Sequence, residues 1–151
     1  EICITTPYFI PDKSFLDAIK IAALSGIDVK ILLPTKSDSF VVNTTSQSNF
    51  QELLNVGVKI YTYNKGFIHA KTMVCDQKVA IIGTANFDNR SFDLNFEVNA
   101  IVYDKQVAKK QRELFEKDLS FSTQLLPDKW KQRPLYMKLI EKVLRLFSSL
   151  M

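Results

Sequence analysis

The sequence predicts an α/β fold, in which a mixed β-sheet is flanked by helices on both faces. Two successive strand–helix–strand units in residues 2–63 support this prediction, because such units favour parallel pairing of their strands. An alternating segment at 69–75 and a short apolar segment at 79–83 indicate a hairpin, which adds antiparallel strands. The 151 residues, of which 46% are apolar, are enough for one domain with a hydrophobic core.

The first unit begins with a strand at residues 2–6. The following segment, 11–26, predicts a helix, which Asp12 can cap and Gly26 can end in a left-handed conformation. The segment 27–34 predicts the second strand of the unit, because its apolar residues run up to a proline that stops it.

The second unit contains a helix at 50–57 and a strand at 58–63. After the hairpin, residues 95–104 predict another strand and residues 105–119 predict a surface helix. The apolar residues of that helix that we expect to face inward are Val107, Leu114 and Phe115.

The composition argues against several kinds of site. The formal charge of +4 suggests an anionic partner only weakly. One histidine and two scattered cysteines argue against a zinc site. Cys3 and Cys75 lie in strand-like apolar segments, where we expect buried free thiols rather than a disulfide. No run of about 18 apolar residues is present, so no transmembrane span is predicted.

The residues suited to chemistry follow one spaced pattern, H-x-K-x4-D-x6-G-T-x-N. Its members are His69, Lys71, Asp76, Gly83, Thr84 and Asn86. Residues two apart on a strand share a face, so Lys71 lies beside His69 and its charge favours the neutral imidazole that a nucleophile needs. Lys71 and Asn86 can bind the same phosphate group, and Gly83 allows close backbone approach.

This pattern resembles the HKD signature of the phospholipase D superfamily. The segments "TPYFIPD", "GVKIYTYNKGFIHAK" and "GTANFDNRSFDLNFE" look more narrowly like the C-terminal half of the bacterial cardiolipin synthases. Thr84 departs from the usual serine of the superfamily but keeps the hydroxyl. The resemblance implies a phospholipase D-like half-domain at 1–125 and an amphipathic helical tail at 126–151, within a longer parent protein whose N-terminal half is absent here.

The activity that this resemblance implies is a phosphatidyl transfer without metal or cofactor, in which two phosphatidylglycerol molecules give cardiolipin and glycerol through a phosphohistidine. One HKD histidine attacks the phosphodiester, and the histidine of the other half transfers the protons. In related enzymes with two motifs the N-terminal histidine is usually taken as the nucleophile, which would make His69 the acid and base; the sequence leaves this open.

The site residues implied by the resemblance fall into three groups. The catalytic residues are His69, Lys71 and Asp76, although the spacing of Asp76 from Lys71 favours a structural role. The phosphate ligands are Lys71, Thr84 and Asn86. The supporting residues are Gly83, Arg90, Ser91 and Glu97.

Some of these residues have two alternative roles. Glu97 either faces outward from an apolar strand or, by the resemblance, orients an active-site imidazole. Arg90 and Ser91 either hold the loop after the motif or contact phosphate. Tyr8 and Phe9 either line the site or pack in the core.

The expected partners are an anionic phospholipid such as phosphatidylglycerol, a second HKD half and a membrane surface, with a homodimer as an alternative; nucleic acid is not expected. We expect the parent protein at the bacterial cell membrane and this chain itself to be soluble or peripheral. Two other functions stay open, a stand-alone homodimeric phosphodiesterase or nuclease and an inactive fragment that binds phosphate or membrane.

The tail contains a strongly amphipathic segment at 134–151. At about 100° per residue, apolar residues from Leu135 to Leu150 share one half of the helical wheel, and charged residues and serines share the other half. The apolar half either packs on protein or lies in a membrane interface.

Overall fold

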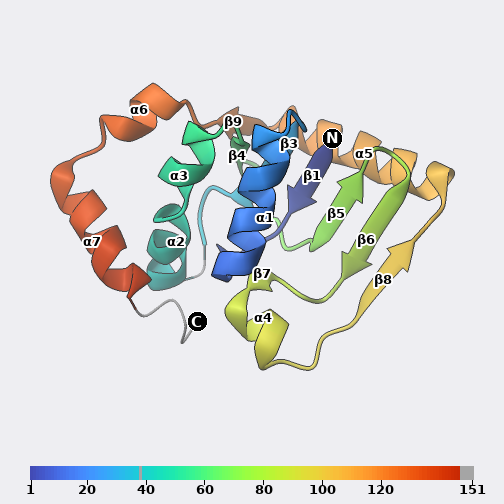
Figure 1. Cartoon of the computed structure of the whole chain (residues 1–151), viewed down its shortest axis with the longest axis horizontal. Coiled ribbons are helices and arrows are strands. Elements are labelled where there is room, and N and C mark those ends of the chain that lie inside the picture. Colours follow the sequence, from blue (N-terminus) through green and yellow to red (C-terminus); the bar gives the residue numbers. More distant parts are fainter. Residues whose placement is uncertain (38, 147–151) are drawn as a thin grey trace.

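The computed structural model describes residues 1–37 and 39–146 and confirms the α/β prediction (Figure 1). Its centre is a seven-stranded sheet. In spatial order the strands are β8 (Asn99–Val102), β6 (Val79–Gly83), β5 (Thr72–Cys75), β1 (Ile2–Thr5), β3 (Val29–Pro34), β4 (Lys59–Tyr63) and β9 (Ser122–Gln124). β1, β3 and β4 are parallel neighbours, whereas the remaining pairs are antiparallel, so the sheet is mixed as predicted.

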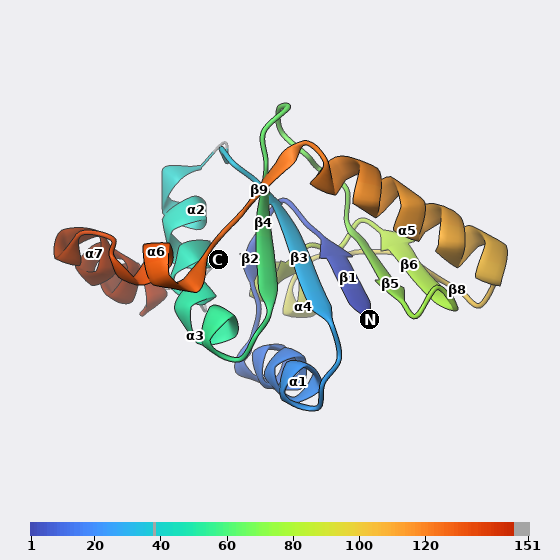
Figure 2. The same ribbon diagram turned by 90° about the horizontal axis from the view of Figure 1, so that it is seen from above.

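Helices cover both faces of this sheet, as Figure 2 shows. α1 (Lys13–Leu24), α2 (Phe40–Gln47) and α3 (Phe50–Asn55) lie on one side, and α5 (Lys105–Leu119) lies on the other. Alternation along the central strands supplies both cores, because Ile4 and Ile31 face the first group of helices while Cys3 and Leu32 face α5.

The inward face of α5 differs in part from the prediction. Phe115 is buried as expected, but Val107 and Leu114 are 40% and 47% exposed. Ala108 takes the other inward position, seven residues before Phe115 and therefore on the same stripe. The stripe that meets the sheet is thus rotated by one residue from the predicted one, which leaves Val107 and Leu114 at its border.

Several local predictions are confirmed. The Asp12 carboxylate caps α1 by accepting from the backbone N–H of Phe15 at 2.8 Å, and Gly26 ends the helix with φ of 86°. The hairpin of β5 and β6 turns through Asp76 and Gln77, both with positive φ. Both cysteines are free thiols, but only Cys3 is fully buried as expected, because Cys75 is half-buried. Burial raises the pKa of the Cys3 thiol to about 11.

Other elements have no counterpart in the prediction. These are α2, β9, β2 (Phe9–Ile10), β7 (Phe87–Asp88) and α4 (Asn89–Asp93). The expected strand at 95–104 is shorter and begins at Asn99. The tail forms α6 (Pro127–Lys131) and α7 (Leu135–Arg145), while the predicted tail residues Phe147 and Leu150 lie outside the described residues. Over residues 1–37 and 39–146, none of the helices has the length and apolar character that crossing a bilayer requires.

Candidate active site

A two-strand parallel pair brings the start of the chain against the motif. β2 pairs with β7, with Phe9 opposite Phe87. The Thr6 hydroxyl, which is buried, donates to the Tyr8 carbonyl at 2.8 Å and accepts from the Phe87 N–H at 3.3 Å. Phe9 is fully buried in the core, which supports its packing role, whereas the Tyr8 ring lies 6.5 Å from the His69 ring and borders the site.

His69 and Lys71 lie side by side in the extended segment that leads from β4 into β5. The Lys71 Nζ is 3.1 Å from the His69 Nε2 and donates to the His69 carbonyl at 2.9 Å. The imidazole is exposed, with Phe67 at 5.5 Å between ring centroids. The predicted shared face is therefore present, although the two residues precede the hydrogen-bonded strand. An ammonium that donates to Nε2 requires the unprotonated form of that nitrogen.

The surroundings of Lys71 alter the pKa of its ammonium. Partial burial lowers the pKa of its ammonium, because desolvation penalises the charged form. The carboxylates of Glu97 and Asp88 act in the opposite direction and favour the charged form. The half-buried cation thus feels two acidic side chains through their charge and contacts the imidazole, where it can meet an anionic ligand.

The turn after β6 is held by a small hydrogen-bonded cluster. The Asp88 carboxylate is buried and caps α4 by accepting from the Ser91 N–H at 2.7 Å. The Ser91 hydroxyl in turn accepts from the Asn86 N–H at 3.1 Å. The side-chain oxygen of Asn86 is buried without a hydrogen-bond partner among the described residues, so its amide has unused capacity for a ligand.

Gly83 and Thr84 join this turn to β8. A Cβ at Gly83 would lie 2.4 Å from the Val98 carbonyl oxygen and 2.7 Å from the Asn99 Cα, so only glycine fits. The Thr84 hydroxyl accepts from the Val98 N–H at 3.0 Å. Gly83 therefore allows the close approach of β6 to β8, and the Thr84 hydroxyl bonds to the backbone. The close approach of backbone to phosphate at Gly83 and the contact of Thr84 with phosphate stay predictions.

Three predicted residues lie apart from the His69–Lys71 pair. Asp76 is at the far end of β5, roughly 16 Å along the strand from Lys71, where it forms the hairpin turn. Arg90 has an exposed side chain on α4. Glu97 accepts from Asn95 at 3.3 Å in this structure and acts on Lys71 through its charge. The role of Glu97 in orienting an imidazole stays a prediction.

An apolar cavity of about 170 Å³ opens beside Lys71. Its walls include Phe15, Met73, Phe87, Phe92 and Asn99. The sequence did not identify three residues of the site, which are Thr6, Asp88 and Asn99. Thr6 and Asp88 lie within the "TPYFIPD" and "GTANFDNRSFDLNFE" segments that carry the family resemblance. Their roles, however, depend on the pairing of β2 with β7, which no local sequence pattern reveals.

Residues 1–119 match the model of the family described as cardiolipin synthase, PLD-like domain. The chain belongs to this family. Beyond the PLD-like domain the similarity extends to the tail, because all 151 residues align at 48% identity with a cardiolipin synthase of Staphylococcus aureus and at 50% identity with the major cardiolipin synthase ClsA of Bacillus subtilis. The chain spans 31% of the length of each of these relatives.

The PLD-like domain also resembles solved structures at low sequence identity. The phospholipase D family member Nuc of Salmonella typhimurium superposes with a TM-score of 0.72 at 18% identity, over 83% of this chain and 81% of that chain. A phosphatidylserine synthase of Haemophilus influenzae superposes with a TM-score of 0.73 at 16% identity, over 99% of this chain and 39% of that chain. These two likenesses establish the fold of the PLD-like domain.

Proposed function

We propose that this chain is one catalytic half of a phosphatidyltransferase of phospholipid biosynthesis, which condenses two phosphatidylglycerol molecules into cardiolipin and glycerol. The contact between the Lys71 ammonium and the His69 Nε2 carries the proposal, because it combines a nucleophilic or proton-transferring nitrogen with a phosphate-binding cation. The family and the names of the relatives support phospholipid synthesis as the process.

The reaction proceeds in two balanced steps. An imidazole nitrogen attacks the phosphorus of one phosphatidylglycerol, a P–N bond forms, and the P–O bond to glycerol breaks while a second imidazole protonates the leaving oxygen. The headgroup hydroxyl of a second phosphatidylglycerol then attacks the same phosphorus, returns its proton to the second imidazole and displaces the first. Lys71 and Asn86 bind the phosphate oxygens, and the assignment of His69 to either imidazole stays open.

Three observations support a lipid substrate and a second half-site. The apolar cavity beside Lys71 offers a surface for the hydrocarbon part of a phosphatidyl group. His69 is the only histidine of the chain, so the second imidazole must come from another half. Near the motif turn, exposed apolar side chains in the segment that leads into β8 offer a surface for that half; they are Leu94, Phe96 and Val98, named here the β8 patch.

The test replaces His69 by alanine in the whole enzyme and measures cardiolipin formed from phosphatidylglycerol. We expect the rate to fall by at least about a hundredfold, because either role of the imidazole contributes at least that much. Lys78→Ala is the control, since this exposed lysine lies at the remote hairpin turn and should leave the rate unchanged. A His69→Ala rate close to that of the wild type would contradict the proposal.

A second assay separates this proposal from a stand-alone phosphodiesterase. The isolated 151-residue chain is incubated with single-stranded DNA and with a generic phosphodiester. We expect no turnover, because one half-site lacks the second imidazole. Hydrolysis that is lost in His69→Ala would contradict the transferase proposal and favour a homodimeric phosphodiesterase.

A further inference from the structure

The tail helix α7 is attached to the domain through its charged side. Glu141 is only 6% exposed and forms a bidentate pair with Arg133, at 2.5 Å and 3.1 Å. One turn further on, Arg145 donates to Glu52 of α3 at 2.9 Å. A buried carboxylate is costly unless it is paired in this way. These ion pairs therefore set which side of α7 meets the protein.

The apolar side of α7 points away from the domain. Its exposed members are Leu135, Tyr136, Leu139, Ile140, Val143 and Leu146. Leu139 at the centre of this face is 64% exposed, whereas Leu144 at its border is half-buried. This arrangement is the reverse of α5, which buries Ala108 and Phe115 and exposes most of its charged residues.

The tail has an apolar anchor in α6, outside α7. Trp130 of α6 stacks on Phe50 of α3 at 5.5 Å between ring centroids. The Arg133 guanidinium lies 3.3 Å above the Trp130 ring and links this anchor to Glu141. Since α6 supplies the apolar anchor, the outward face of α7 is not needed to hold the tail in place.

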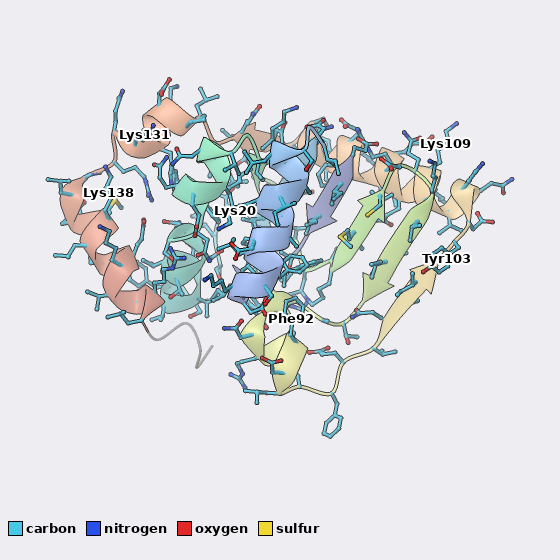
Figure 3. All side chains as sticks on the ribbon, viewed as in Figure 1. Lys20, Phe92, Tyr103, Lys109, Lys131 and Lys138 are labelled. Atoms are coloured by element: carbon cyan, nitrogen blue, oxygen red, sulfur yellow. The ribbon has the colours of Figure 1, made fainter. Side chains whose placement is uncertain are left out.

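The positive charge of the chain is concentrated in the same region. Residues 127–151 contain six basic and two acidic side chains, a net +4, whereas residues 1–126 contain 14 of each and are neutral. Lys138 and Lys142 border the apolar face on the helical wheel, and Figure 3 shows Lys131 and Lys138 at the α6–α7 end of the molecule. An apolar stripe edged with lysines matches an anionic lipid surface in both polarity and charge.

We infer that α7 is a membrane-docking helix, whose outward apolar face enters the interface of an anionic phospholipid bilayer while its charged side holds the catalytic domain. The segment between α4 and β8, which carries the β8 patch, lies away from α7 in Figure 1, so a second half bound there leaves α7 free for the membrane. The inference rests on the proposed function only for the choice of phosphatidylglycerol as the lipid.

The experiment measures co-flotation of the 151-residue chain with vesicles. Vesicles of about one-third phosphatidylglycerol in phosphatidylcholine are compared with vesicles of phosphatidylcholine alone. We expect binding to the anionic vesicles, weaker binding to the neutral ones, and a loss of at least about tenfold in partitioning for Leu139→Asp. Ile21→Asp is the matched control, because Ile21 is equally exposed at 64% on α1 and should leave partitioning unchanged.

Charge reversal provides an independent test of the electrostatic part. Lys142→Glu should weaken binding to the anionic vesicles several-fold, whereas Lys109→Glu on the exposed side of α5 should not. Binding that is equal in wild type and Leu139→Asp would overturn the inference. A second outcome would also overturn it: the wild-type chain does not bind vesicles but self-associates, and Leu139→Asp abolishes the self-association. That result would assign the apolar face to a protein interface.

These outcomes do not depend on catalysis. His69→Ala should float with the vesicles as well as the wild type does, because the imidazole lies on the segment before β5 and not on the tail. A failure of vesicle binding therefore overturns the docking inference alone, and a failure of cardiolipin synthesis overturns the proposed reaction alone.

Discussion

The ammonium of Lys71 is the group whose removal tests the phosphate-binding role most directly. Lys71→Met should lower the rate of the whole enzyme by roughly 10²–10³-fold, because it removes one fixed donor from the transition state. The measurement is kcat/KM for cardiolipin synthesis, with Lys78→Met as the control at the remote hairpin turn. A loss in Lys71→Met no larger than in the control would show that Lys71 does not contact the reacting phosphate.

The lowered pKa of Lys71 adds a pH signature to the same prediction. Because the protonated form binds phosphate, kcat/KM should fall as the pH rises through the Lys71 pKa, which lies below the ordinary lysine value of 10.5. Lys71→Arg keeps the charge at all accessible pH values. Any activity that this variant retains should therefore extend to higher pH.

At the residue scale, the sequence predicted what depends on short spacing. His69 and Lys71 are two residues apart, and their side chains contact each other as the spacing indicates. The engagement of Thr84 with the Val98 backbone was not predictable, because it depends on where the chain returns 14 residues later. The charge effect of Glu97 on Lys71 was unpredictable for the same reason, since it depends on β8 pairing with β6.

Among the elements, the junction of β6 with β8 is the most sensitive to a single methyl group. Gly83→Ala places a Cβ within 2.4 Å of the Val98 carbonyl oxygen, which forces the two strands apart. The free energy of unfolding should fall by about 1–3 kcal/mol, measured by urea denaturation.

Hydrogen exchange locates this effect. In Gly83→Ala the amides of Thr84 and Val98, which bond across the junction, should exchange faster, whereas those of the central strands β1 and β3 serve as the internal control. Unchanged stability with unchanged exchange in β8 would show that the junction tolerates a side chain.

The elements that the sequence predicted are those with a clear internal pattern. The hairpin alternates, and α1 has an apolar stripe with a cap at Asp12. α2 was missed because "FVVNTTSQ" is rich in β-branched and polar residues of low helix propensity, and its Thr44 and Thr45 hydroxyls bond to their own helix. β2 and β7 contain two residues each and exist only because they pair with each other.

For the whole molecule, the β8 patch is the surface that we expect to receive the second half-site. Phe96 is fully exposed in this chain, and Phe96→Asp in the whole enzyme should lower activity at least about tenfold by weakening that contact. The free energy of unfolding of the 151-residue chain should not change, because no packing is lost within it. Leu24→Asp on α1, also largely exposed, is the control. Equal activity in the two variants would contradict this role of the patch.

The sequence predicted the amphipathic tail but not its orientation. Periodicity from Leu135 onward defines an apolar face, yet it does not say whether that face meets protein or solvent. The choice is made by Glu141 and Arg145, whose ion pairs are formed with Arg133 and with Glu52, a residue 93 positions away in the chain. Distant pairings of this kind are beyond the reach of local pattern.

The hydrogen bond from Phe87 to the Thr6 hydroxyl joins residues 81 positions apart and holds the turn that carries Asn86. Contacts of such long range form slowly, because the chain must lose much conformational entropy before the favourable contact energy offsets that loss. The reactive geometry therefore arises only when β2 has paired with β7, and a nascent chain that has not yet been synthesised to residue 87 has no competent phosphate site. The NMR signal of the His69 imidazole, the single histidine of the chain, should accordingly report when the site has folded as well as the chemistry at the site.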